Sequence, residues 1–328
     1  MLLQSGLLII GFVVLIKGAD FLVNGSSSIA KRFNVSNLAI GLTVVAMGTS
    51  MPEFIVSLLS ALNGKSDASF GNIIGSNNFN MLFILGVSGI IYPLVVQRNT
   101  IKFEVPISLG AALVLFLLVN DTMVGMGNAS ETQNELSRLD SLVLLILFLF
   151  FLLYIYRTMS KTTDLEEGVP IKMYSVWTSI GLTLAGIAML IGGGKLVVDS
   201  ATYIAHEAGL SEKLIGLTIL AIGTSLPELA TSAVAAYRKN TDIAIGNVVG
   251  SNIFNILLIL GVTGIIHPIP YNIALNFDLQ VLGAATLLLL IFMFTLKQRS
   301  LDRWEAMLLL LSYVAYTVYL VGMEADQV

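Results

Sequence analysis

The chain has no cysteine among its 328 residues and only two histidines. The absence of cysteine excludes disulfides and thiolate metal sites. Charged residues are also scarce, at 12% of the sequence, whereas they make up about a quarter of an average soluble protein. The formal net charge of −4 is spread over connecting segments. Nothing in this composition points to a nucleic-acid partner, and a metal site built on cysteine thiolates is excluded.

Long apolar runs are what the sequence has in excess. Hydrophobic residues make up 56% of the chain, and the mean hydropathy is +0.88. A helix needs about 20 mostly apolar residues to cross a bilayer. The sequence therefore predicts an all-α polytopic membrane protein with ten transmembrane helices and little chain left for a soluble domain. The ten candidate spans are 2–23, 36–62, 69–94, 103–119, 140–156, 173–199, 213–237, 242–266, 276–296 and 304–323.

The distribution of lysine and arginine predicts the orientation in the membrane. The odd-numbered loops between spans carry 12 of these residues, and the even-numbered loops carry 3. Because positively charged loops stay on the cytoplasmic side, the odd loops are predicted to be cytoplasmic. The sequence thus predicts a multi-pass protein of the cell membrane with both termini on the extracytoplasmic side.

The sequence repeats itself after a shift of 175 residues. "IGLTVVAMGTSMPE" aligns with "IGLTILAIGTSLPE", and "GNIIGSNNFNMLFILGVSGIIYP" aligns with "GNVVGSNIFNILLILGVTGIIHP". The copies, 41–95 and 216–270, are five spans apart, so they run through the membrane in opposite directions. Inverted repeats of this kind are typical of secondary transporters. We expect an N-terminal five-helix half (1–157), a cytoplasmic linker (158–172) and an inverted C-terminal five-helix half (173–328).

A duplication that kept two helices only for packing is the alternative explanation of the repeat. It fits the apolar identities, but it fits the retained polar residues poorly, because polar groups inside a membrane are costly unless they are used.

The first motif places a proline and a carboxylate inside an apolar span. Pro52 cannot donate to the carbonyl of Gly48, so carbonyl oxygens around Ala46 to Thr49 are expected to leave the helical hydrogen-bond pattern. Such freed backbone is tolerated in a membrane only when it lines a cavity or is packed in protein. Hydroxyls and a carboxylate add further oxygens, and hard cations prefer such ligands. The residues concerned are Thr49, Ser50 and Glu53, with Thr224, Ser225 and Glu228 in the copy.

The second motif places polar side chains along one helix face. Asn72, Ser76 and Asn80 are spaced four residues apart, so they share a face, and Asn247, Ser251 and Asn255 repeat the pattern. Interhelical hydrogen bonding explains Asn72 and Asn247 equally well. Asn77 and Asn252 point away from this face and are interpreted as structural residues.

Charge balance limits which ions the site could bind and transport. Two facing carboxylates are neutralised by one divalent cation or by two or more monovalent cations. Two glutamates and two carbonyls offer up to about six oxygens, which suits Ca2+, whereas Mg2+ holds its water too tightly. Transition metals favour histidine, and both histidines lie outside the motifs.

At "GTSMPE…GNIIGSNNFN" and "GTSLPELATS…GNVVGSNIFN" the chain resembles the cation/calcium antiporter superfamily, and within it the prokaryotic Na+/Ca2+ exchangers. The resemblance covers nearly the whole chain. It implies a transporter rather than an enzyme, with Ca2+ and Na+ as transported ions. Neither a cofactor nor an obligate protein partner is implied, and the lipid bilayer is the expected surrounding.

The resemblance also implies a ligand set. Ca2+ would be held by Glu53 and Glu228 and by the carbonyls of Thr49 and Thr224. Asn80 matches the asparagine of the family's first repeat. The Na+ sites would draw on Ala46, Ser50, Ser76, Ala221, Ser225 and Ser251. At Asn255 the chain departs from well-studied Na+/Ca2+ exchangers, which carry Asp there, so one carboxylate is missing from the centre.

Other functions remain open at this point. Within the same class, H+ or K+ could replace Na+ as the driving ion. A cation channel is a different possibility, against which the inverted repeat argues. An intramembrane hydrolase would need a serine with histidine or lysine, or paired aspartates at depth, and the motifs contain no such set.

Overall fold

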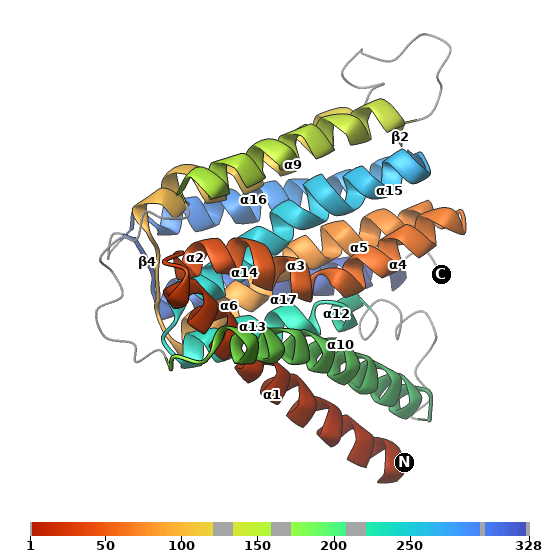
Figure 1. Cartoon of the computed structure of the whole chain (residues 1–328). Coiled ribbons are helices and arrows are strands. Elements are labelled where there is room, and N and C mark those ends of the chain that lie inside the picture. The colour runs from red at the N-terminus through yellow and green to blue at the C-terminus, as the bar shows by residue number, and fades with distance from the viewer. Residues whose placement is uncertain (1, 121–133, 159–171, 208–220, 296–298, 326–328) are drawn as a thin grey trace.

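Helices make up almost all of the structure, a computed structural model that describes residues 2–120, 134–158, 172–207, 221–295 and 299–325 (Figure 1). Among these residues, eight helices are long and apolar enough to cross a membrane, and a bent pair, Asn37–Thr49 and Met51–Leu62, raises the number to nine. Part of the remaining predicted span, 213–237, lies outside the described residues. The all-helical architecture of a polytopic membrane protein is confirmed.

The first half of the chain supplies the elements α1 Leu2–Arg32, α2 Asn37–Ile40, η1 Gly41–Val45, α3 Ala46–Thr49, α4 Met51–Leu62, α5 Ser66–Asn78, η2 Phe79–Ile84, α6 Leu85–Ile91, β1 Leu94–Val95, η3 Thr100–Glu104, α7 Val105–Leu118, β2 Glu135–Leu136 and α9 Arg138–Thr158. The second half supplies α10 Val176–Glu207, α12 Ala221–Gly223, α13 Leu226–Tyr237, α14 Thr241–Ile253, η6 Phe254–Leu260, α15 Gly261–Ile266, β3 Ile269–Pro270, η7 Ile273–Leu275, α16 Asn276–Phe292, β4 Ser300–Leu301 and α17 Arg303–Ala325.

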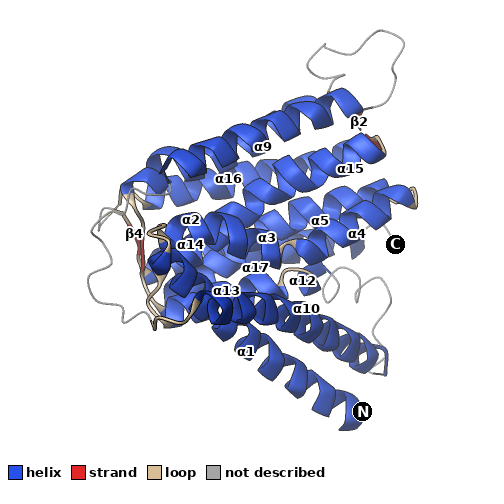
Figure 2. Cartoon of the chain, viewed as in Figure 1, coloured by secondary structure: helices blue, strands red, loops and turns tan. Residues whose placement is uncertain are grey.

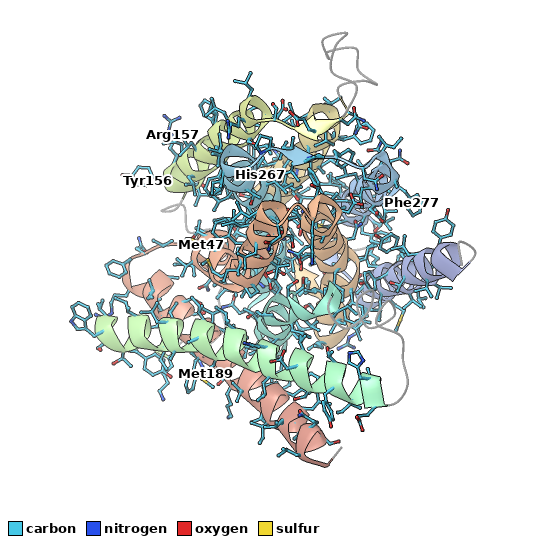
Figure 3. The ribbon with its side chains drawn as sticks, turned by 90° about the vertical axis from the view of Figure 1, so that its right-hand side faces the viewer. Met47, Tyr156, Arg157, Met189, His267 and Phe277 are labelled. Atoms are coloured by element: carbon cyan, nitrogen blue, oxygen red, sulfur yellow. The ribbon has the colours of Figure 1, made fainter. Side chains whose placement is uncertain are left out.

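Two continuous helical segments lie at the centre of the bundle. The segments α5–η2–α6 and α14–η6–α15 each have 78% of their most apolar stretch buried inside the protein, whereas the value is between 17% and 39% for the other long helices. The outer helices expose large apolar side chains, and Tyr156 and Phe277 lie at the periphery of the bundle (Figure 3). The two central segments contain the second motif of each repeat, so that motif sits away from lipid.

Glycine allows the broken span of the first repeat to approach the central helix of the second repeat. A Cβ atom on Gly246 of α14 would lie 3.0 Å from the carbonyl oxygen of Leu38 and 3.1 Å from the Cα atom of Gly41. Only a residue without a side chain fits so close to another backbone, which is the role of small residues between membrane helices. This contact holds the first motif of one repeat against the second motif of the other.

Helices α1 and α10 form a crossed pair at one side of the bundle (Figures 1 and 3). They touch through glycines, since a Cβ on Gly186 would lie 2.6 Å from the backbone nitrogen of Leu22. Both helices are longer than the sequence predicted: α1 ends at Arg32 instead of residue 23, and α10 ends at Glu207 instead of residue 199. The extension of α1 is polar but still packed, because Gly25 and Ser28 meet α10 and the chain just before it.

Two short antiparallel strand pairs close the ends of the bundle. Strand β1 pairs with β4, and β2 pairs with β3. The two pairs lie at opposite ends of the helices (Figure 2). Counted along the chain between the ten predicted spans, β1 and β4 lie at the third and ninth loops. Strands β2 and β3 lie in the fourth and eighth loops. Loops predicted for the same side of the membrane therefore meet.

Candidate functional site

The helix of each first motif breaks immediately before the proline. Helix α3 ends at Thr49, α4 begins at Met51, and the two are bent by 47°. Ser50 occupies the break with φ −81° and ψ 7°, and Ser225 has nearly the same conformation, φ −90° and ψ 6°. Proline is well suited to the first turn of a helix because that turn needs no N–H donor there. The span is therefore broken next to Pro52.

The Ala46 carbonyl does not follow the prediction. It accepts the backbone N–H of Ser50 at 3.0 Å. The oxygen therefore stays in the helical hydrogen-bond pattern, because the break begins only after Ser50 has closed the last turn. In the second motif the Ser225 N–H donates to Ile222, three residues back, and Ala221 begins the short helix α12.

The two motif glutamates lie in the first turns of α4 and α13 and are fully buried. A helix N-terminus favours a negative group, because the aligned peptide dipoles place partial positive charge there. Each carboxylate also accepts a hydrogen bond from the other repeat: the Ser225 hydroxyl donates to Oε1 of Glu53 at 2.9 Å, and the Ser50 hydroxyl donates to Oε1 of Glu228 at 2.9 Å. The two repeats thus build one shared centre.

Serines of the second motif complete the contacts to the same carboxylate oxygens. The Ser76 hydroxyl lies 3.2 Å from Oε1 of Glu53, and the Ser251 hydroxyl lies 3.4 Å from Oε1 of Glu228. The hydroxyls of Ser76 and Ser225 are 2.7 Å apart. Oε1 of each glutamate is therefore held by two serines, one from each repeat.

Four buried oxygen atoms at this centre have no hydrogen-bond partner among the described residues. They are Oε2 of Glu53, Oε2 of Glu228, Oδ1 of Asn80 and Oδ1 of Asn255. Each buried polar atom without a partner costs free energy, so four on equivalent residues of the two repeats need an explanation. Asn80 and Asn255 lie on the wide π-helical turns η2 and η6, which often occur at functional sites.

Asn72 and Asn247 have the interhelical hydrogen-bonding role that the sequence left open. Their side-chain oxygens accept hydroxyl hydrogen bonds from the opposite repeat, from Thr224 at 3.2 Å and from Thr49 at 3.0 Å. Their amide groups donate to a serine hydroxyl and to a glutamate backbone carbonyl. These acceptors are Ser57 and Glu53 for Asn72, and Ser232 and Glu228 for Asn247. Both ends of each amide are used, so these residues fix the motif helices to one another.

Asn77 and Asn252 contact the site, although their positions in the sequence suggested a purely structural role. The amide nitrogen of Asn255 donates to Oδ1 of Asn77 at 2.9 Å, and that of Asn80 donates to Oδ1 of Asn252 at 2.9 Å. The shift of 175 residues relates Asn77 to Asn252, and this could have marked them as a pair. Their contact with the site could not be read from an ideal α-helix, because the helix widens at Phe79.

The donor set is made of oxygen alone. The described residues contain no group of three or more His, Cys, Asp or Glu that could hold a metal ion. Two carboxylates with neutral hydroxyl and amide oxygens are ligands for a hard cation of low charge. The serine contacts to the two glutamates and the asparagine contacts at Asn72 and Asn247 recur in both repeats, so the centre has approximate two-fold symmetry.

Comparison with known proteins identifies the family of the chain. The family model described as sodium/calcium exchanger protein matches residues 3–157 and 178–322. The chain belongs to this family. The two matched segments nearly coincide with the two halves that the internal repeat predicts.

Individual relatives agree with this family. A putative antiporter, CaxA, of Alkalimonas amylolytica is 38% identical over 96% of this chain and 98% of its own length. The sodium/calcium exchanger MaX1 of Methanosarcina acetivorans is 32% identical over 96% of this chain and 97% of its own. A solved structure of the sodium-calcium exchanger NCX_Mj superimposes with a TM-score of 0.80 at 34% identity, covering 96% of this chain and 97% of that one. Exchangers and antiporters are transporters, not enzymes, and this chain is a multi-pass membrane member of their family.

Proposed function

We propose that this protein exchanges Na+ for Ca2+ across the membrane by alternating access to one centre between its two repeats. The observation that carries the proposal is the set of four unpartnered oxygens on Glu53, Glu228, Asn80 and Asn255. Two are carboxylate oxygens and two are neutral amide oxygens, and all four are fully buried. A bound cation provides the partner that the protein itself does not.

The contacts of the glutamates support a ligand assignment. Ca2+ takes oxygen ligands of mixed charge, so Oε2 of Glu53 and Oε2 of Glu228 are its principal ligands, with backbone carbonyls of Thr49 and Thr224 beside the helix breaks. Na+ occupies flanking positions next to the serine hydroxyls that already contact the carboxylates. These serines are Ser50, Ser76, Ser225 and Ser251. The carbonyl oxygens of Ala46 and Ala221 are further candidate ligands for Na+. That of Ala46 accepts the backbone N–H of Ser50, and a carbonyl oxygen has a second lone pair for an ion.

Exchange follows from charge balance at a shared centre. With both glutamates ionised, the centre carries two negative charges, which one Ca2+ or two Na+ neutralise. Uncompensated charge inside a membrane is expensive, so one kind of ion leaves as the other enters. Neutral hydroxyls and carbonyls flank the carboxylates and offer ligands for a third Na+.

The architecture we propose has ten spans in two inverted halves, 1–157 and 173–328, joined by a cytoplasmic linker at 158–172. The two segments matched by the family model support the division. The strand pairs support the sidedness, because each joins loops predicted for one side of the membrane. In this topology both termini are extracytoplasmic.

Movement of α1 and α10 is the proposed source of alternating access. Inverted-repeat transporters move one group of helices against another around a fixed site. The pair α1–α10 lies at one side of the bundle and carries none of the motif residues (Figure 1). Its contacts with the site helices include Ile187, whose Cδ1 lies 2.6 Å from where a Cβ on Gly48 would be.

The deciding experiment is Ca2+ uptake into proteoliposomes that contain the purified protein. Vesicles loaded with Na+ are diluted into Ca2+ buffer without Na+, and matched vesicles are loaded with K+ or with a pH gradient instead. We expect uptake only with the Na+ gradient, and none in Glu53→Gln. If K+ or the pH gradient drove uptake equally well, K+ or H+ would take the place of Na+ as the driving ion in the proposal. Uptake without any opposing gradient, at a channel's rate, would overturn the antiporter.

A further inference from the structure

Four asparagines form a hydrogen-bonded network across the two repeats, which we call the asparagine box: Asn77, Asn80, Asn252 and Asn255. Asn255 donates to Oδ1 of Asn77, and Asn80 donates to Oδ1 of Asn252, both at 2.9 Å. The remaining amide groups donate across the repeats to backbone oxygens: Asn77 to the carbonyl of Asn252 at 3.4 Å, and Asn252 to the carbonyl of Asn77 at 3.3 Å. All four side chains are fully buried.

The box determines which end of each site amide faces the ion. An amide has one accepting and one donating end, and the network decides which is which. If Asn255 turned round, its oxygen would face the Oδ1 of Asn77, and two acceptors would meet. Asn77 cannot turn to relieve this, because its own oxygen would then face the backbone carbonyl of Asn252. Backbone carbonyls cannot exchange roles, so the orientation of the whole box is fixed.

We infer that Asn77 and Asn252 are positioning residues that lock the side-chain oxygens of Asn255 and Asn80 toward the transported cation and keep their NH2 groups away from it. The inference rests on the proposed function, because it assumes that a cation occupies the centre. It gives a role to two residues that touch neither glutamate in the described contacts. It also explains why Oδ1 of Asn80 and Oδ1 of Asn255 are left without a partner.

The asparagine box also favours a neutral side chain at position 255 that can donate a hydrogen bond. An ionised aspartate there would place a carboxylate oxygen against Oδ1 of Asn77 with no hydrogen between them. Buried acceptors that face each other are unfavourable. The box therefore favours a centre with two carboxylates, those of Glu53 and Glu228, over one with three.

Loss of the box should weaken cation binding through competition within the protein. Without Asn77, the amide of Asn255 is free to rotate and to donate to an unpartnered carboxylate oxygen. A hydrogen bond to a charged group is strong enough to change an equilibrium about tenfold. The cation must break that bond to bind, so the Ca2+ concentration for half-saturation should rise about tenfold in Asn77→Ala. Asn252→Ala should have the same effect through Asn80.

The test is a Ca2+ binding isotherm on the purified full-length protein in lipid nanodiscs without Na+. The matched control is Asn78→Ala: the neighbouring asparagine is equally buried, but its amide donates to the backbone oxygen of Asp278 at 3.0 Å, outside the box. We expect Asn77→Ala and Asn252→Ala to shift the half-saturation point and Asn78→Ala to leave it unchanged. Equal shifts in all three variants would reduce the box to ordinary packing and overturn the inference.

A double variant separates positioning from packing. At a pH high enough to ionise an aspartate at 255, that side chain has two equivalent oxygens and needs no orientation, so removing Asn77 should not weaken Ca2+ binding there. We expect Asn77→Ala to shift the isotherm about tenfold in the wild type, and to leave it unchanged or improve it in the Asn255→Asp background. A full additional shift in that background would overturn the inference.

The outcome also distinguishes this inference from the proposed function. Ca2+ binding that Glu53→Gln abolishes and Asn77→Ala leaves intact would retain the exchanger and reject the positioning role. A wild type that binds no Ca2+ would reject the exchanger, and with it the role assigned to the box.

Discussion

The hydroxyl of Ser50 donates a hydrogen bond to the carboxylate of Glu228, 178 residues further along the chain, at 2.9 Å. The equivalent pair, Ser225 and Glu53, has the same separation of 2.9 Å. Each glutamate is therefore held by a serine of the opposite repeat, so neither repeat can form the site alone. The predictions below depend on this shared construction.

Neutralising either motif glutamate should abolish gradient-driven Ca2+ flux. A hard divalent cation needs both carboxylates, so Glu53→Gln and Glu228→Gln should each lose more than about 100-fold of the uptake rate. Size-exclusion profiles should show that both variants remain folded. The matched control is Glu104→Gln, a buried carboxylate whose Oε1 accepts the Tyr154 hydroxyl at 2.5 Å away from the motifs. Near-normal flux in either site variant would remove that glutamate from the centre.

The two serines should be equivalent. Ser50→Ala and Ser225→Ala each remove one hydrogen bond to a buried carboxylate. A hydrogen bond to a charged group contributes about 1.5–3 kcal/mol, so each variant should raise the half-saturating ion concentration by about tenfold or more, and both by a similar factor. Ser88→Ala is the control, since the Ser88 hydroxyl is buried on α6 without a partner among the described residues. A large effect in one serine variant and none in the other would contradict the two-fold equivalence.

Replacing Na+ by Ca2+ should move α10 relative to the site helices. The sequence has no cysteine, so single cysteines can be introduced without background. A Cβ on Gly194 would lie 3.8 Å from the ring of Pro227, which places Gly194→Cys at the contact between α10 and α13. Its reactivity toward a water-soluble thiol reagent should differ between the two ions. Leu139→Cys, at the exposed start of α9, should label alike in both. Unchanged labelling at 194 would count against movement of α10.

A carboxylate at position 255 should make exchange sensitive to pH. Asn255→Asp puts a third acid beside Glu53 and Glu228, and repulsion between like charges favours its protonated form. Protonated aspartic acid can donate to Asn77 as asparagine does, whereas the ionised form cannot. We expect exchange to persist in Asn255→Asp and to vary more steeply with pH than in the wild type at a fixed Na+ gradient. Superimposable pH profiles would show that residue 255 does not sense the charge of the centre.

The parts of the site that sequence analysis predicted are those that local chemistry determines. Pro52 breaks its helix wherever that helix lies, and Glu53 at the start of the new helix follows from the same turn. The repeat made Glu228 its partner. The fold class followed equally directly, because apolar runs of this length have few alternatives to membrane helices.

The parts that were missed depend on contacts between distant segments. Asn77 and Asn252 reach the site only because two π-helical turns change the face on which neighbouring residues lie and because the two repeats cross there. The Ala46 carbonyl was expected to be free, but Ser50 still closes one helical turn onto it. A pattern within one helix cannot show either feature.

One measurement tests the shared centre most directly: Ca2+ binding to the purified wild type in nanodiscs, titrated at increasing fixed Na+ concentrations. If Na+ and Ca2+ use the same two carboxylates, Na+ will raise the Ca2+ concentration for half-saturation progressively and leave the maximum binding unchanged. Glu53→Gln should bind no Ca2+ at any Na+ concentration. A Ca2+ isotherm that high Na+ does not shift would show separate sites and contradict exchange at one centre.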